Sequence, residues 1–169
     1  MSVTTRIRAV AAVLAGLALG YCLFTFGIAL LRVSGSSMEP ALHDGAFVLV
    51  LRPGLDFLFR SGGPRGGDVV VLSVPGSTER VVKRVAATAG QVIAMHDGVV
   101  LVDGGRAIAA TVPGAFAGHH SFDAVSVKPG HVYVLGDNRL PLASRDSRDF
   151  GPVELAAVRG RVVFPRTGL

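Results

Sequence analysis

The most constraining feature of this sequence is a long apolar segment near its N-terminus. Residues from Ala9 to Leu31 include no charged side chain, and Arg8 and Arg32 border the segment. As an α-helix it would be roughly 34 Å long, enough to cross the hydrocarbon core of a bilayer. The sequence therefore predicts a cytoplasmic N-terminus at residues 1–8 and a membrane anchor at residues 9–31.

A cleaved secretory signal peptide is the alternative interpretation, because it also begins with basic residues and continues into Ala and Leu. Its apolar core is normally only about 7 to 15 residues long, so a retained anchor is favoured. Arg6 and Arg8 place the N-terminus in the cytoplasm. We therefore predict a single-pass protein of the cell inner (cytoplasmic) membrane, with the lipid bilayer as a partner and residues 32–169 on the extracytoplasmic side.

Residues 32–169 are enough for one domain with its own hydrophobic core. The only cysteine, Cys22, lies in the predicted anchor, so we expect neither a disulfide nor a Cys-based metal site in the domain. Short Val-rich runs alternate with Gly, Pro and Asp, which predicts a mainly β fold after the transmembrane helix. The predicted strands are Phe47–Leu51, Asp68–Val74, Arg80–Ala86, Gln91–Met95, Val99–Val102, His131–Leu135 and Gly160–Phe164.

The segments between these strands contain turn and loop signals. Asp97-Gly98 separates two apolar runs, which predicts a tight hairpin with positive φ at both residues. Arg60–Gly67 and Thr111–Ser121 contain Gly and Pro without periodicity, so both are predicted surface loops. Leu55–Phe59 is apolar between turns and has two interpretations, a core strand, which is slightly favoured, or an apolar loop facing the membrane.

The net charge of +5 does not indicate a nucleic-acid partner, because the basic residues are scattered and no run of four occurs. A solvated basic surface and a weak attraction to anionic lipid headgroups remain as interpretations. The five histidines show no paired metal-ligand spacing beyond the adjacent His119 and His120. We therefore expect no metal and no other cofactor.

Two short clusters contain residues that could take part in nucleophilic chemistry. Ser34, Ser36 and Ser37 follow the anchor in VSGSSMEPAL, a pattern that taken alone is typical of a linker. Lys83 shares one face of a predicted strand with two valines, so partial burial would lower its pKa. A shift of about 3 from the free value near 10.4 would make it a usable base at neutral pH. The alternative is that Lys83 reaches water from a sheet edge.

A third cluster, from Leu135 to Val153, is rich in alternating charges. Its charged residues are Asp137, Arg139, Arg145, Asp146, Arg148 and Asp149. Such residues usually form weak surface ion pairs. Ser144 and Ser147 could instead hydrogen-bond a neutral amine and orient it.

The three clusters together resemble the motifs of bacterial type I signal peptidases and the related mitochondrial inner-membrane peptidases. The Ser-Met motif corresponds to Gly35–Leu42 and the lysine motif to Lys83–Val85, followed by Gly90. The remaining matched residues are Gly136, Asp137 and Asn138, then Ser144, Asp146, Ser147 and Arg148. All three motifs occur in the family's order behind an N-terminal span.

The sequence departs from the family pattern at four places. Ala41 replaces the usual Thr, Gln91 replaces an Asp, and Leu140–Ala143 lengthen the segment before Ser144. Gly35 stands where a Ser would supply a side-chain donor to the oxyanion. The backbone N–H of Ser37 is therefore the expected donor.

The resemblance implies a membrane-bound serine endopeptidase that removes signal peptides from exported preproteins. In that interpretation Ser37 is the nucleophile and Lys83 the general base of a Ser-Lys dyad. Ser144 would orient the amine, and Asp146 with Arg148 would hold the surrounding loop. Gly136, Asp137 and Asn138 would support the site, and Met38, Pro40 and Val82 would contact the signal peptide.

Two other functions remain open from the sequence. A self-cleaving Ser-Lys regulator has a similar core fold and mechanism but acts on its own chain. An inactive, membrane-tethered β-domain that only binds partners is the third possibility. The Ala-, Gly- and Arg-rich composition favours a bacterial over a mitochondrial membrane.

Overall fold

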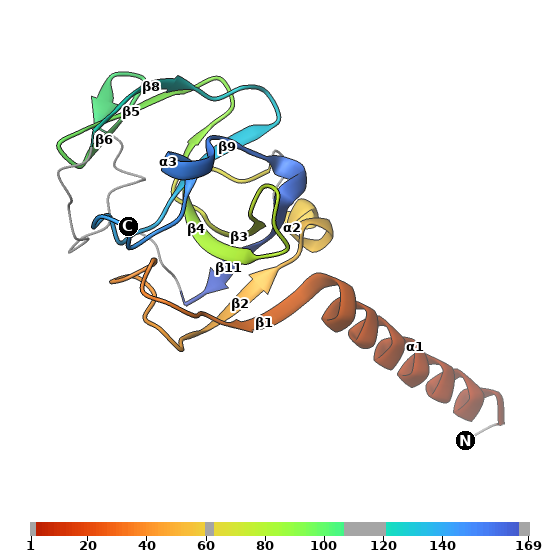
Figure 1. The fold of residues 1–169 in the computed structure, drawn as a ribbon. Coiled ribbons are helices and arrows are strands. Elements are labelled where there is room, and N and C mark those ends of the chain that lie inside the picture. The colour runs from red at the N-terminus through yellow and green to blue at the C-terminus, as the bar shows by residue number, and fades with distance from the viewer. Residues whose placement is uncertain (1–2, 60–62, 107–120, 166–169) are drawn as a thin grey trace.

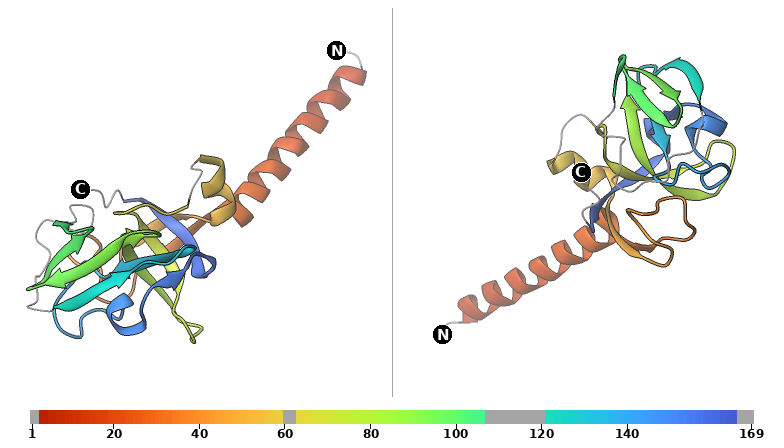
Figure 2. Two further views of the ribbon diagram at one scale, coloured as in Figure 1. Left: turned by 90° about the horizontal axis from the view of Figure 1, so that it is seen from above. Right: turned by 90° about the vertical axis from the view of Figure 1, so that its left-hand side faces the viewer.

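The computed structural model describes residues 3–59, 63–106 and 121–165. Helix α1 (Val3–Gly27) projects from a β-rich domain made of two sheets (Figures 1 and 2). Within α1, Val3–Cys22 is long and apolar enough to span a membrane, and none of it is buried against the rest of the molecule. The mainly β fold behind an N-terminal apolar helix is as predicted.

The predicted helical anchor is wrong at its C-terminal end. The helix ends at Gly27, and the next residues form strand β1 (Ile28–Arg32), which pairs antiparallel with β2 (Phe47–Leu51). An uninterrupted apolar run contains no signal that separates a helix from a strand. Here the pairing with β2, which lies later in the chain, decides the conformation.

The larger sheet has seven strands in the order β1-β2-β11-β3-β4-β9-β10. Besides β1 and β2 its strands are β3 (Val69–Ser73), β4 (Arg80–Thr88), β9 (His131–Leu135), β10 (Val153–Glu154) and β11 (Val158–Phe164). Neighbouring strands of this sheet are antiparallel. Sequence-distant strands therefore lie side by side, which brings the three motif clusters onto one framework.

The smaller sheet has the order β7-β6-β5-β8. Its strands are β5 (Val92–His96), β6 (Val99–Val102), β7 (Gly105–Arg106) and β8 (Phe122–Ser126). Asp97 and Gly98 join β5 to β6 with φ values of 47° and 77°, so the predicted hairpin is confirmed. All seven predicted strands are present, with ends shifted by at most two residues.

Both interpretations of Leu55–Phe59 are wrong, because this segment belongs to helix α2 (Pro53–Phe59). Pro53 suits the first position of a helix, where its missing N–H has no intrahelical acceptor. The N–H groups of Leu55 and Asp56 donate to the Arg52 carbonyl. Residues 63–67 of the predicted loop contain no helix or strand, whereas residues 111–120 lie outside the described part of the chain.

Two further helical segments are short, α3 (Ser147–Phe150) and a 3₁₀ turn at Leu155–Ala157. Three clusters of buried side chains form the core of the domain. One of them joins β1, β2, β3 and β11 to the segment after β1. Its buried members are Val33, Met38, Leu42, Val48, Val50, Val69, Val71 and Val162.

Candidate active site

The segment after β1 presents Ser37 at the edge of a core cluster. Met38 is 0% exposed and Leu42 is 1% exposed, so the residues next to Ser37 are fixed by hydrophobic packing. Gly35 has φ of 89°, a value that glycine adopts easily, and its N–H donates to Asp44 Oδ1 at 2.8 Å. Packing on one side and this turn on the other leave Ser37 partly exposed.

The structure corrects the predicted role of Met38. A side chain with 0% exposure has no free surface, so Met38 packs in the core and presents no surface to the groove. Pro40 is half-buried and lies outside the lining of the groove described below, whereas Val82 belongs to that lining. Of the three predicted substrate contacts, only Val82 therefore faces the groove.

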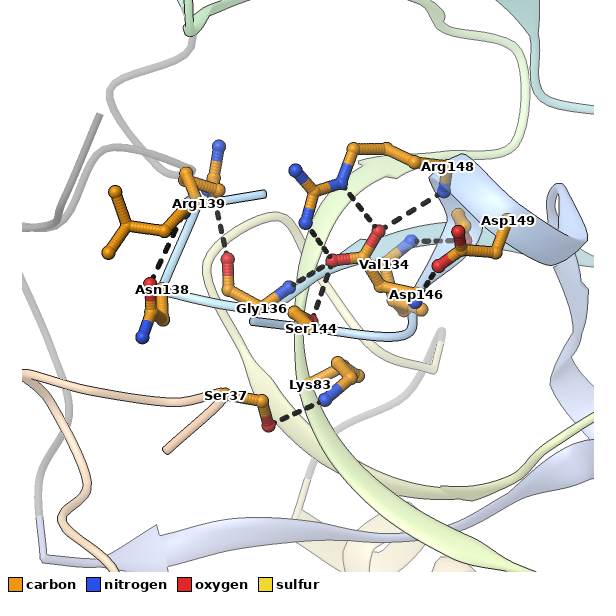
Figure 3. Close-up of polar contacts among 12 residues, drawn as sticks. Ser37, Lys83, Val134, Gly136, Asn138, Arg139, Ser144, Asp146, Arg148 and Asp149 are labelled. Carbon is orange, nitrogen blue, oxygen red and sulfur yellow. Dashed lines mark hydrogen bonds and ion pairs between the residues drawn. The ribbon is translucent and has the colours of Figure 1, made fainter. Parts of the chain in front are cut away.

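Lys83 lies beside Ser37. Its Nζ donates a hydrogen bond to Ser37 Oγ at 2.7 Å, although the two residues are 46 positions apart (Figure 3). Lys83 is only 2% exposed, so the alternative in which it reaches water from a sheet edge is wrong. Burial lowers the pKa of the Lys83 amine from 10.5 to about 8, against a partial opposing effect of Asp146 and Asp137.

The neighbouring Arg84 joins β4 to the segment after β9. Its Nε and Nη2 donate to the two carboxylate oxygens of Asp137 at 2.8 and 2.7 Å, and both side chains are almost completely buried. Arg84 Nη1 also donates to the Gly67 carbonyl at 2.8 Å. This bidentate pair satisfies two charges that would be costly to bury alone. It holds the Gly136–Asn138 segment against the strand that bears Lys83.

The Gly136–Asn138 segment also touches the Ser37 loop directly. A Cβ at Gly136 would lie 2.6 Å from the carbonyl oxygen of Ser37 and would collide with Ser144, so only glycine allows this approach. The backbone N–H of Asn138 donates to the Ser37 carbonyl at 3.1 Å, and its Nδ2 donates to the Ser36 carbonyl at 3.2 Å. One loop therefore contacts both the nucleophile and the strand of the base.

Asp146 is the centre of a second polar network on the far side of Gly136 (Figure 3). It is 0% exposed and accepts hydrogen bonds from Ser144 Oγ at 2.8 Å, Gly136 N–H at 2.9 Å and Arg148 Nε at 2.8 Å. Burial alone would raise the pKa of Asp146, but the bonds from Arg148 and Gly136 lower it below the usual range. Asp146 therefore stays ionised, and it also caps α3.

Ser144 has a different hydrogen-bond partner from the predicted one. Its hydroxyl donates to Asp146, and within the described residues no hydrogen bond joins it to Lys83. Ser147, the other serine of this cluster, accepts from the Val134 N–H at 2.9 Å. Asp146 and Arg148, which the resemblance implies hold this loop, form an ion pair with Nε and Oδ1 2.8 Å apart.

A groove of about 610 Å³ runs past the Ser37–Lys83 pair. Lys83 and the four residues before it line one side of the groove, and the end of β1 with the following loop lines the other. The lining residues are Leu31, Arg32, Val33, Ser34, Gly35, Ser36, Ser37, Val71, Glu79, Arg80, Val81, Val82, Lys83, Ala143 and Arg145. The contribution of β1 was not predicted from the sequence, since Leu31 was assigned to the helical anchor.

Both walls of the groove include a strand edge that pairs with no other strand in the described part of the chain. β1 is the terminal strand of the seven-stranded sheet, and β4 pairs with β9 only from Arg84 onwards. Among the strands of residues 3–59, 63–106 and 121–165, residues 80–83 of β4 therefore pair with β3 alone. An extended peptide could form backbone hydrogen bonds with such edges, and a serine hydroxyl bonded to a buried amine lies between them.

Comparisons with known proteins identify the family of this chain. A family model described as signal peptidase, peptidase S26, matches residues 6–167. Signal peptidase I of Bacillus caldolyticus is 32% identical over 144 residues, covering 78% of this chain and 75% of that protein. Mitochondrial inner membrane protease subunit 1 of Homo sapiens is 29% identical over 147 residues, covering 86% of this chain and 74% of that protein.

A crystal structure shows the same fold. Signal peptidase I from Enterococcus faecalis aligns with a TM-score of 0.52 and 24% identity, over 62% of this chain and 100% of that chain. Fold and sequence together define a serine endopeptidase of the hydrolase class. The chain belongs to the signal peptidase family, peptidase S26, and is a membrane peptidase of the class that cleaves signal peptides.

Proposed function

We propose that this protein removes signal peptides from exported preproteins with a Ser37–Lys83 dyad. The observation that carries the proposal is the hydrogen bond of 2.7 Å between Lys83 Nζ and Ser37 Oγ. The low exposure of Lys83 supports it, because a pKa of about 8 leaves a usable fraction of the amine neutral near physiological pH.

The proposed reaction has an acylation and a deacylation step. Neutral Lys83 accepts the proton of the Ser37 hydroxyl while Oγ attacks the carbonyl carbon of the scissile peptide bond. Lys83 then returns the proton to the leaving amine, which departs with the mature protein. A water molecule, deprotonated by the same amine, hydrolyses the ester to release the signal peptide and free Ser37.

The substrate would lie in the groove as an extended strand. Its backbone would bond to the free edges of β1 and of residues 80–83, which supports binding without demanding a particular sequence. Val71 and Val82 on the wall favour apolar side chains. Selection of the small residues that end signal peptides would then come from the limited depth of the groove.

Membrane attachment would place this groove near its substrates. An apolar row crosses the neighbouring strands β1, β2 and β11. Leu30 of β1 and Phe164 of β11 both pair with Leu49 of β2. Phe47 lies two residues before Leu49 and therefore on the same face of the sheet. Leu30, Phe47 and Phe164 are 61% to 65% exposed. This row begins three residues after α1, so we place it in the outer leaflet of the inner membrane, with Arg6 and Arg8 in the cytoplasm.

A preprotein cleavage assay with the full chain in detergent tests the proposed function. Ser37→Ala and Lys83→Ala should each lose cleavage almost completely while circular dichroism shows the parent fold. Ser126→Ala and Lys128→Ala are matched controls, because both residues are exposed and lie on or next to β8, and they should cleave at the parent rate.

Two results would contradict this function. Cleavage by Ser37→Ala at the parent rate would exclude Ser37 as the nucleophile. A purified parent chain that shortens itself stoichiometrically and leaves the preprotein intact would instead indicate a self-cleaving regulator.

A further inference from the structure

Asn138 is fixed against the Ser37 loop by two hydrogen bonds, and a third bond within its own segment orients its side chain. Its backbone N–H donates to the Ser37 carbonyl at 3.1 Å, and its Nδ2 donates to the Ser36 carbonyl at 3.2 Å. Its Oδ1 accepts from the Leu140 N–H at 3.2 Å, which sets the orientation of the side-chain amide. Asn138 is 5% exposed, so little water competes for these bonds.

The two carbonyls that Asn138 binds belong to the peptide units on either side of the Ser37 α-carbon. The Ser36–Ser37 peptide is trans. In a trans peptide the C=O and N–H groups point in opposite directions. Because the Ser36 carbonyl points to buried Asn138, the Ser37 N–H points away from it.

The Ser37 N–H is the group that an oxyanion would need. Among the described residues it donates to no acceptor, and both Ser36 and Ser37 line the groove. Gly35 has no side chain that could act as a second donor. Stabilisation of the oxyanion therefore depends on the orientation of this one peptide unit. A single correctly placed donor of this kind contributes about 10² to 10³ in rate.

We propose that Asn138 is a positioning residue that orients the Ser36–Ser37 peptide, so that the Ser37 N–H donates to the oxyanion. The inference rests on the proposed function, since it assumes acyl transfer to Ser37. Asn138 itself touches neither the substrate nor the base. Its loss should therefore weaken binding of the transition state and leave binding of the intact substrate unchanged.

The test compares Asn138→Leu with the parent, both as full chains in detergent. Leucine has a similar volume and keeps the backbone N–H, but it lacks the Nδ2 donor. We expect kcat for a preprotein to fall by about 10²-fold and KM to stay within about twofold. The midpoint of the pH–rate profile should not move, because Lys83 and its bond to Ser37 are unaltered. Leu142→Ala, on an exposed part of the same loop, should match the parent.

A peptide aldehyde ending in alanine gives an independent readout. Ser37 Oγ adds to the aldehyde carbon, the hydroxyl proton passes to Lys83, and the former carbonyl oxygen becomes an oxyanion facing the Ser37 N–H. Asn138→Leu should bind this aldehyde about 10²-fold more weakly than the parent. The corresponding uncleaved peptide should bind equally to Ser37→Ala and to the Ser37→Ala, Asn138→Leu double variant.

The inference is overturned if Asn138→Leu keeps the parent kcat and aldehyde affinity. It is also overturned if the Asn138→Leu change lowers the affinity for the aldehyde and, in the Ser37→Ala background, the affinity for the uncleaved peptide by the same factor. A shift in the midpoint of the pH–rate profile of Asn138→Leu would overturn it too, because a merely structural role predicts these results. If Asn138→Leu does not fold, Asn138→Ala is measured in the same way. In all of these cases the loss of activity in Ser37→Ala and Lys83→Ala still supports the proposed function.

Discussion

The burial of the Lys83 amine prepares it to act as a base but lowers the free energy of unfolding. Its pKa is lowered from 10.5 to about 8 in the folded chain, mainly because burial disfavours the ammonium. Between these two values the unfolded chain binds more protons than the folded one, so the free energy of unfolding rises with pH from about 8 to 10.5. At pH 7 the lowered pKa costs the folded state about 3 kcal/mol of stability relative to an amine whose pKa does not change on folding.

Lys83→Met should abolish cleavage and yet stabilise the fold. At pH 7 we expect its free energy of unfolding to exceed that of the parent by about 1 to 3 kcal/mol, because the buried charge is absent. The difference should shrink as the pH approaches 10. Urea unfolding at both pH values measures it, with Lys128→Met as the control for an exposed lysine. If the free energy of unfolding of the parent and of Lys83→Met depended on pH in the same way, the lowered pKa of Lys83 would be contradicted.

Gly136 lies where the segment after β9 packs against the Ser37 loop. Gly136→Ala should lower the free energy of unfolding by about 1 to 3 kcal/mol, since its Cβ would meet the Ser37 carbonyl at 2.6 Å and would also collide with Ser144. Cleavage should fall at least tenfold as the Ser37 loop shifts. Gly54→Ala is the control, because the space around that glycine is open. If Gly136→Ala and Gly54→Ala had equal free energies of unfolding and equal activities, the close approach of Gly136 to the Ser37 carbonyl would be contradicted.

The resemblance to the signal peptidase motifs singled out Ser37 and Lys83, which each cluster taken alone left open, and the structure brings these side chains together. The partner of Ser144 and the complete burial of Met38 were not predictable in the same way. The burial of Met38 depends on segments distant in sequence, since Met38 packs against β2, β3 and β11. Ser144 instead donates to Asp146, only two residues away, because the carboxylate competes with the Lys83 amine for its hydroxyl. A motif identifies residue types in order, whereas burial depends on the tertiary packing around them.

The buried ion pair of Arg84 and Asp137 joins strand β4 to the segment after β9. Asp137→Ala would leave a buried guanidinium without its carboxylate, so we expect the free energy of unfolding to fall by about 3 to 5 kcal/mol. The exposed pair of Glu79 and Arg145 provides a control, and Glu79→Ala should cost less than about 1 kcal/mol. Urea unfolding of both variants makes the comparison. A similarly small loss of unfolding free energy in Asp137→Ala and Glu79→Ala would show that the buried pair does not hold the two segments together.

The strands with clear Gly, Pro or Asp boundaries were predictable, because turn residues mark both of their ends. β1 was not, since it continues the apolar run of α1 without a boundary residue. Helix α2 was also missed, because a seven-residue apolar segment between turns has no period long enough to identify it. The short strand β10, with two residues, carries no periodicity at all.

At the scale of the whole molecule, α1 and the apolar row of Leu30, Phe47 and Phe164 would together fix the orientation of the groove to the membrane. Phe47→Glu with Phe164→Glu should slow cleavage of a membrane-bound preprotein in liposomes severalfold, because two charges would have to enter the interface. Cleavage of a short soluble peptide in detergent should be unchanged. Equal rates on the membrane-bound preprotein for parent and variant would show that this face does not contact lipid.

The pH dependence of kcat/KM for the full chain tests the central claim most directly, because it reports the ionisation of the free enzyme. A neutral Lys83 amine acting as base predicts that activity rises tenfold per pH unit on the acid side and levels off with a midpoint near pH 8. A rate that is flat between pH 6 and 10, or that keeps rising to a midpoint near 10.5, would contradict the claim that burial prepares this amine to deprotonate Ser37.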